Sequence, residues 1–98
     1  MADILVPGDF NALDAPLELE ASVAGAPVRL QLAVEAVAPL PAHRLRAEPF
    51  SLVLRGPRTP LLPQATYALR HPRLGKIELF LVPVGQDADA TRYEALFN

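Results

Sequence analysis

Cysteine and tryptophan are absent from the 98-residue sequence, and aromatic residues make up only 6% of it. The absence of cysteine excludes disulfide bonds and thiolate metal sites, and it is typical of proteins from a reducing compartment. Because 51% of the residues are hydrophobic while aromatics are scarce, leucine, valine and alanine must supply most of the core. A chain of this length can bury one core, so we expect a single β domain over residues 1–98.

A targeting segment and a membrane-spanning run are also lacking. The N-terminal residues show no basic region followed by a long apolar stretch, which a signal peptide would have. No apolar run approaches the ~18 residues that a membrane span needs. We therefore expect a cytoplasmic protein with no membrane partner.

Charge of one sign does not dominate, because the formal net charge is only −2. It is unevenly distributed: residues 1–42 carry six acids and one base, residues 43–76 seven bases and one acid, and residues 77–98 four acids and one base. Opposite charges that face each other on neighbouring strands would account for this pattern. A nucleic-acid surface would need clustered bases, whereas these are scattered singly, so we predict no nucleic-acid partner.

Eleven prolines and five glycines divide the chain into short segments whose apolar and polar residues alternate. Such spacing is typical of an all-β fold. We expect about six mostly antiparallel strands, forming a small barrel or a sandwich, at residues 16–23, 28–35, 50–55, 65–71, 77–84 and 91–98. One short helical turn is expected near the N-terminus, where Asp9 can cap it and Phe10 and Leu13 form an apolar edge.

The inward positions of these strands, together with the helical turn, predict the core. Two segments, 38–49 and 56–64, are too rich in proline for central strands and are expected to be exposed connections. The expected core residues are Phe10, Leu13, Leu17, Leu19, Leu30, Leu32, Val34, Phe50, Leu52, Leu54, Tyr67, Leu69, Ile77, Leu79, Leu81, Tyr93 and Phe97.

No motif for catalysis, metal binding or cofactor binding stands out. A metal site would need His43 and His71 to converge with carboxylates, and the sequence gives no reason for this. The two serines, Ser22 and Ser51, lie within strand patterns rather than on a nucleophile elbow. Residues 87–98 lack the Gly and Glu positions of a calcium loop. We predict no enzyme activity, no catalytic or metal site and no cofactor.

The segment 77–84 is apolar on both faces, with Phe80, Val82 and Val84 opposite the inward residues. A half-buried antiparallel strand would alternate with polar residues instead. Three explanations are open: a central strand covered on its second face, an interface with a protein partner or another copy, or the lining of a cavity for an apolar ligand. The partner-binding candidates are Phe80, Val82 and Val84, with Leu61 and Leu62 from the proline-rich loop.

An alternative function is a small ligand-binding barrel that recognises an anionic or apolar molecule. In this hypothesis Arg55, Tyr67 and Arg70 hold an anionic group at the mouth of the barrel, because guanidinium groups pair well with carboxylate and phosphate. The leading hypothesis remains a non-enzymatic structural or protein-interaction module.

The second half of the chain carries an ordered set of segments: FSLVLRGP at residues 50–57, LPQATY at 62–67, HPRLG at 71–75, LFLVPVG at 79–85 and YEALFN at 93–98. This set resembles the DUF6916-type family of small bacterial proteins of unknown function. Members of this family are often encoded beside phage-tail-collar-like proteins. The resemblance therefore implies an accessory component of a phage-tail-like assembly.

Overall fold

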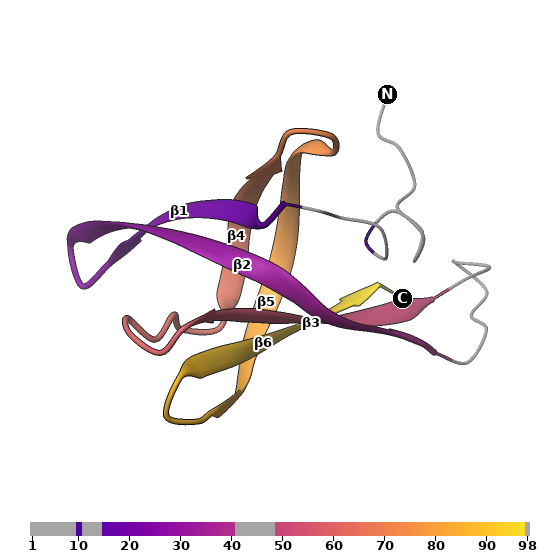
Figure 1. Ribbon diagram of the computed structural model, residues 1–98. Coiled ribbons are helices and arrows are strands. Elements are labelled where there is room, and N and C mark those ends of the chain that lie inside the picture. Colours follow the sequence, from indigo (N-terminus) through magenta and orange to yellow (C-terminus); the bar gives the residue numbers. More distant parts are fainter. Residues whose placement is uncertain (1–9, 11–14, 41–48, 98) are drawn as a thin grey trace.

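The computed structural model describes residues 10, 15–40 and 49–97. Its six strands are β1 (Leu17–Val23), β2 (Ala26–Pro39), β3 (Phe50–Pro57), β4 (Ala65–His71), β5 (Gly75–Gln86) and β6 (Ala90–Phe97). They pair antiparallel in the order β1-β2-β3-β6-β5-β4, and β4 pairs back with β1 to close a barrel (Figure 1). This confirms the all-β fold and, of the two expected architectures, shows the barrel rather than the sandwich. The expected helical turn lies outside the described residues, apart from Phe10.

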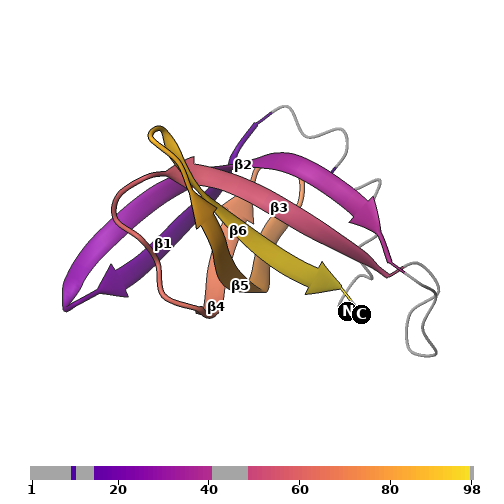
Figure 2. The ribbon, with the colours of Figure 1, turned by 90° about the horizontal axis from the view of Figure 1, so that it is seen from below.

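Two long strands bend and are shared by both halves of the barrel. The first part of β2 pairs with β1 and its second part with β3, and the register shifts between Val34 and Ala36. In the same way β5 pairs first with β4 and then with β6, with a shift between Pro83 and Gly85. Such irregularities bend a strand. As a result, β2 runs diagonally from the side of β1 to the side of β3, as Figures 1 and 2 show.

The turn between β1 and β2 contains two residues, because Val23 pairs directly with Ala26. Ala24 and Gly25 both have positive φ angles, 53° and 82°. This is the geometry of a type I′ turn, whose twist suits a two-residue hairpin. The sequence placed the turn over residues 24–27, so β2 begins two residues earlier than expected. It also ends later, at Pro39, inside the segment expected to be an exposed connection.

The inward positions of the strands form one core, as the alternation predicted. Of the expected core residues, Val34, Ile77 and Phe97 are partly buried and pack against it, and Leu13 lies outside the described residues. One end of the core is aromatic: Phe50 and Phe97 stack with ring centroids 4.3 Å apart, and Phe10 packs against both rings. Phe10 therefore covers this end of the barrel. The remaining expected core residues are buried: Phe10, Leu17, Leu19, Leu30, Leu32, Phe50, Leu52, Leu54, Tyr67, Leu69, Leu79, Leu81 and Tyr93.

The opposite end is closed by the loop at residues 58–64. Leu62 is fully buried there, and its backbone N–H donates to the Tyr93 hydroxyl at 3.0 Å. The Tyr67 hydroxyl donates to the Pro63 carbonyl. The Arg58 carbonyl accepts a hydrogen bond from Thr91 at 3.1 Å. Two tyrosines on β4 and β6 thus fix a proline-rich loop across the barrel.

Candidate functional site

The outer face of β5 and β6 carries exposed apolar side chains. Phe80, Val84 and Leu96 are 51%, 53% and 55% exposed, and Val82 between them is half-buried. These four residues are here named the apolar outer face. Val82 pairs with Glu94 on β6, and the same register places Phe80 and Leu96 at matching positions just beyond the last paired residues. Exposed apolar side chains gathered on neighbouring strands are typical of an interaction surface.

The predicted orientation of β5 is therefore confirmed: Leu79 and Leu81 point inward, and Phe80, Val82 and Val84 point outward. Leu96 was missed by the sequence analysis. The signal was present, because Tyr93, Ala95 and Phe97 turn inward on β6 and alternation then places Leu96 outside.

The two leucines of the proline-rich loop differ in their exposure to solvent. Leu61 is half-exposed, but Leu62 is fully buried in the core. Assigning Leu62 to a partner-binding surface was wrong, because the Tyr93 hydroxyl holds its backbone N–H and directs the side chain into the barrel end. Leu61 lies on this loop at the end of the barrel, outside the apolar outer face as defined.

Arg55, Tyr67 and Arg70 do not form the predicted anion site. Tyr67 points into the barrel, whereas Arg70 on the same strand points outward. The Tyr67 hydroxyl already donates to the Pro63 carbonyl, and burial raises the pKa of Tyr67. Arg55 lies on β3, which does not pair with β4. The three residues therefore cannot bind one group together.

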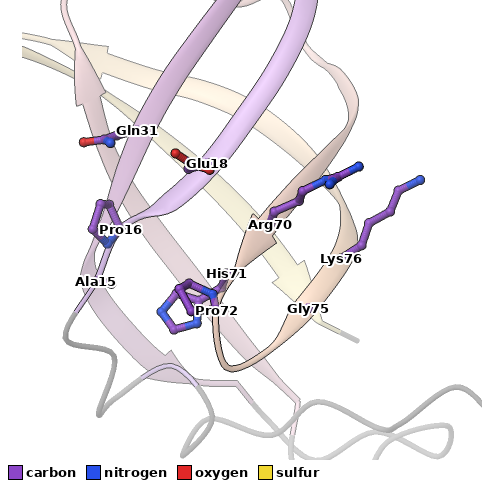
Figure 3. A pocket seen from close by; sticks show the side chains of 9 residues that line it. All are labelled: Ala15, Pro16, Glu18, Gln31, Arg70, His71, Pro72, Gly75 and Lys76. Atoms are coloured by element: carbon purple, nitrogen blue, oxygen red, sulfur yellow. The ribbon is translucent and has the colours of Figure 1, made fainter.

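A hollow of about 660 Å³ lies where β1 and β4 separate. The two strands pair only at Glu18–Arg70 and Leu19–Leu69. Beyond these pairs stand Pro16 and Pro72, which have no N–H for a strand ladder. Figure 3 shows the lining side chains: Ala15, Pro16 and Glu18 of the β1 segment, Gln31 of β2, Arg70, His71 and Pro72 at the end of β4, and Gly75 and Lys76 of β5. This hollow is here named the seam cleft.

His71 is an unusual residue of the seam cleft, because it is polar and only 5% exposed. Its Nδ1 accepts a hydrogen bond from the Arg73 N–H at 3.0 Å. A neutral imidazole that accepts at Nδ1 carries its hydrogen on Nε2. That buried Nε2 has no hydrogen-bond partner among the described residues. A buried donor without a partner is rare and costs free energy.

The charge pattern predicted that the acidic residues 1–42 face the basic residues 43–76, and among the described strands only Glu18 and Arg70 are paired in this way. The ion pairs of the described residues join other positions. Glu20 and Arg29 are cross-strand partners and form an ion pair at 2.7 Å. Arg92 on β6 hydrogen-bonds Glu35 at the β2 bulge and Asp87 in the β5–β6 turn. Backbone N–H groups of Asp89 and Ala90, together with Arg92, lower the pKa of Asp87 to about 2. This network connects β2, β5 and β6 on the outside of the barrel.

Within residues 10, 15–40 and 49–97, no group of three or more histidine, aspartate or glutamate side chains is placed to hold a metal ion. His43 lies outside the described residues. The same ranges contain no helix with the length and hydropathy of a membrane span. The carboxylate of Asp87 accepts hydrogen bonds from the backbone of its own turn.

Comparison with known families gives a match over most of the chain. A family described as "Domain of unknown function (DUF6916)" matches residues 9–97. The match thus extends well beyond the second half of the chain, where the sequence analysis placed most of the resemblance. No curated protein and no solved structure matches the chain significantly.

Proposed function

Because the chain belongs to the DUF6916 family, whose function is unknown, we propose a function from its surface: a non-enzymatic protein-interaction module that docks through the apolar outer face. The observation that carries this proposal is the exposure of Phe80, Val84 and Leu96 on adjoining strands of a closed barrel. Burying apolar surface contributes roughly 25 cal/mol per Å², so covering three half-exposed large side chains is favourable.

The charges around this face favour one kind of partner. Glu78 and Glu94 lie on the outer face of β5 and β6, and neither forms an ion pair with another described residue. A second copy of the chain would bring the same acidic rim against itself. A different protein with an apolar centre and a basic rim complements both features.

The neighbouring ion network supports a preformed surface. Arg92, two residues before Glu94 on β6, is fixed by hydrogen bonds to Glu35 and Asp87. Fixed side chains lose less conformational freedom on binding, which favours association. We place the partner in a multi-protein assembly, and the phage-tail-like assembly implied by the family resemblance is the specific case to test.

The test compares two substitutions on the face with one outside it. Photo-crosslinking from position 82 in the native host is expected to capture one partner, whose purified form then binds with 1:1 stoichiometry. Phe80→Gln and Leu96→Gln should each weaken binding by about tenfold or more, since hot-spot truncations cost at least ~1–2 kcal/mol. Leu61→Gln, at an equally exposed leucine outside the face, should leave binding unchanged.

Other outcomes would contradict the proposal. Sedimentation showing a concentration-dependent dimer that Phe80→Gln abolishes would identify a second copy as the occupant instead. Equal effects of Leu61→Gln and Leu96→Gln would show that general hydrophobicity, and not this face, determines binding. A captured partner that belongs to no tail-like assembly would overturn the phage-tail hypothesis. The proposal of a protein-interaction module would still stand.

A further inference from the structure

The seam cleft has the volume and the chemical groups of a small-molecule site. The residues that line it are different from those of the apolar outer face. Its volume of about 660 Å³ falls within the ~300–1,000 Å³ typical of ligand pockets. Proline rings form its apolar part at Pro16 and Pro72, and polar groups surround them. We propose that the seam cleft binds a small organic monocarboxylate that has an apolar body and a separate hydrogen-bond acceptor.

Two cations at one side of the cleft provide the carboxylate position. Arg70 and Lys76 are direct cross-strand partners, and Figure 3 shows their side chains extending in the same direction, away from Pro16 and Pro72. Like charges placed directly opposite each other destabilise a sheet. Neither side chain forms an ion pair with another described residue. A carboxylate between them relieves this repulsion and forms charge-assisted hydrogen bonds.

The neighbouring charges select a monoanion. Glu18 is the cross-strand partner of Arg70 on its other side. Glu18 beside Arg70 and Lys76 leaves a local excess of one positive charge. The single carboxylate of a ligand neutralises this excess. A phosphate dianion would exceed this charge and would be repelled by Glu18.

His71 provides the second, independent observation. It lines the same cleft, it is 5% exposed, and its Nε2 donor has no partner among the described residues. Arg70 and His71 are adjacent and point to opposite faces of β4. A ligand that uses both must therefore carry its acceptor away from its carboxylate, and its carbon skeleton passes over Pro16 and Pro72.

The experiment uses NMR titration of the full chain with hippurate, which has a carboxylate, an amide carbonyl and an apolar ring. Saturable shifts are expected at the backbone amides of residues 15, 17, 18, 70, 71 and 73–76. The Nε2–H signal of His71 should move with hippurate, whereas benzoate, which has no separate acceptor, should leave it unmoved and bind more weakly. Arg70→Gln and Lys76→Gln should each weaken hippurate binding by about tenfold, because hydrogen bonds to charged groups contribute that much.

Arg55→Gln is the matched control, since Arg55 is an exposed strand arginine that is not among the residues lining the cleft. It should leave the affinity for hippurate unchanged. The absence of saturable binding by hippurate, or equal weakening by Arg55→Gln and Arg70→Gln, would overturn the site. Inorganic phosphate binding as tightly as hippurate would overturn the carboxylate assignment.

Discussion

Tyr93 accepts a hydrogen bond from the backbone N–H of Leu62, which lies 31 residues earlier in the chain. The donor and acceptor are 3.0 Å apart, and both residues are fully buried. This bond joins the interior of β6 to the proline-rich loop that covers one end of the barrel. It explains why two adjacent leucines differ so sharply: the loop is held in an orientation that directs Leu62 inward and leaves Leu61 outside.

The first prediction concerns this bond. Tyr93→Phe removes the hydroxyl acceptor and leaves the buried Leu62 N–H unpaired, which should lower the free energy of unfolding by ~1–3 kcal/mol. Leu62→Ala should cost ~2–5 kcal/mol because it leaves a cavity under the loop. Urea denaturation monitored by circular dichroism measures both changes.

Leu61→Ala is the matched control for the loop. Because Leu61 is half-exposed, its truncation should change stability by no more than ~0.5 kcal/mol. Similar losses for Leu61→Ala and Leu62→Ala would mean that the loop does not close the barrel as described.

A second prediction concerns Gly56 on β3, whose backbone lies close to the side chain of Leu32 on β2. A Cβ added at Gly56 would lie 2.4 Å from the Cδ2 atom of Leu32, which is itself fully buried. Gly56→Ala should therefore lower the free energy of unfolding by ~1–3 kcal/mol through overpacking. Gly85→Ala is the control, since no atom lies within 4 Å of a Cβ there. A stability loss at Gly85 equal to that at Gly56 would refute the packing explanation.

The third prediction uses the two-residue turn between β1 and β2. Ala24 has a φ of 53°, a left-handed conformation that costs an L-residue with a Cβ ~1–2 kcal/mol and that asparagine tolerates better. Ala24→Asn should raise the melting temperature, with a gain in unfolding free energy of up to about 1 kcal/mol. Ala26→Asn, two residues later in the strand, should give no gain because asparagine is disfavoured in strands. Destabilisation by Ala24→Asn would argue against the I′ turn.

The sequence predicted the strands and their inward faces well because alternation is a local property. The orientation of β5 could be predicted because Leu79 and Leu81 alternate with Phe80 and Val82 whatever lies beside the strand. Leu61 and Leu62 could not be separated in this way, since a proline-rich loop has no period and a distant tyrosine hydroxyl decides between them.

The seam cleft was missed because it depends on a non-local strand pair. Arg70 faces Lys76 across a hairpin, but it faces Glu18 only because β4 returns to pair with the first strand. The proposed grouping of Arg55 with Tyr67 and Arg70 failed for the same reason. The residue types alone suggested an anion-binding site. The order of the strands, however, determines which cationic side chains line the same cleft.

The last prediction is a dependence of stability on pH. The Asp87 carboxylate accepts backbone hydrogen bonds from Asp89 at 2.8 Å and Ala90 at 2.9 Å, and it also pairs with Arg92. These contacts lower its pKa from 3.8 to about 2. Because the folded pKa lies below the unfolded one, the stabilisation is fully present above pH ~4 and is lost as the pH falls towards ~2.

Asp87→Asn removes the charge while keeping the size of the side chain. The variant should be less stable than the wild type at neutral pH, and the two unfolding curves should converge as the pH falls from ~4 to ~2. Urea titrations across this range measure the difference. A gap that stays constant down to pH ~2 would mean that the charge of Asp87 makes no contribution to stability, because protonation then leaves the wild type unchanged relative to the variant.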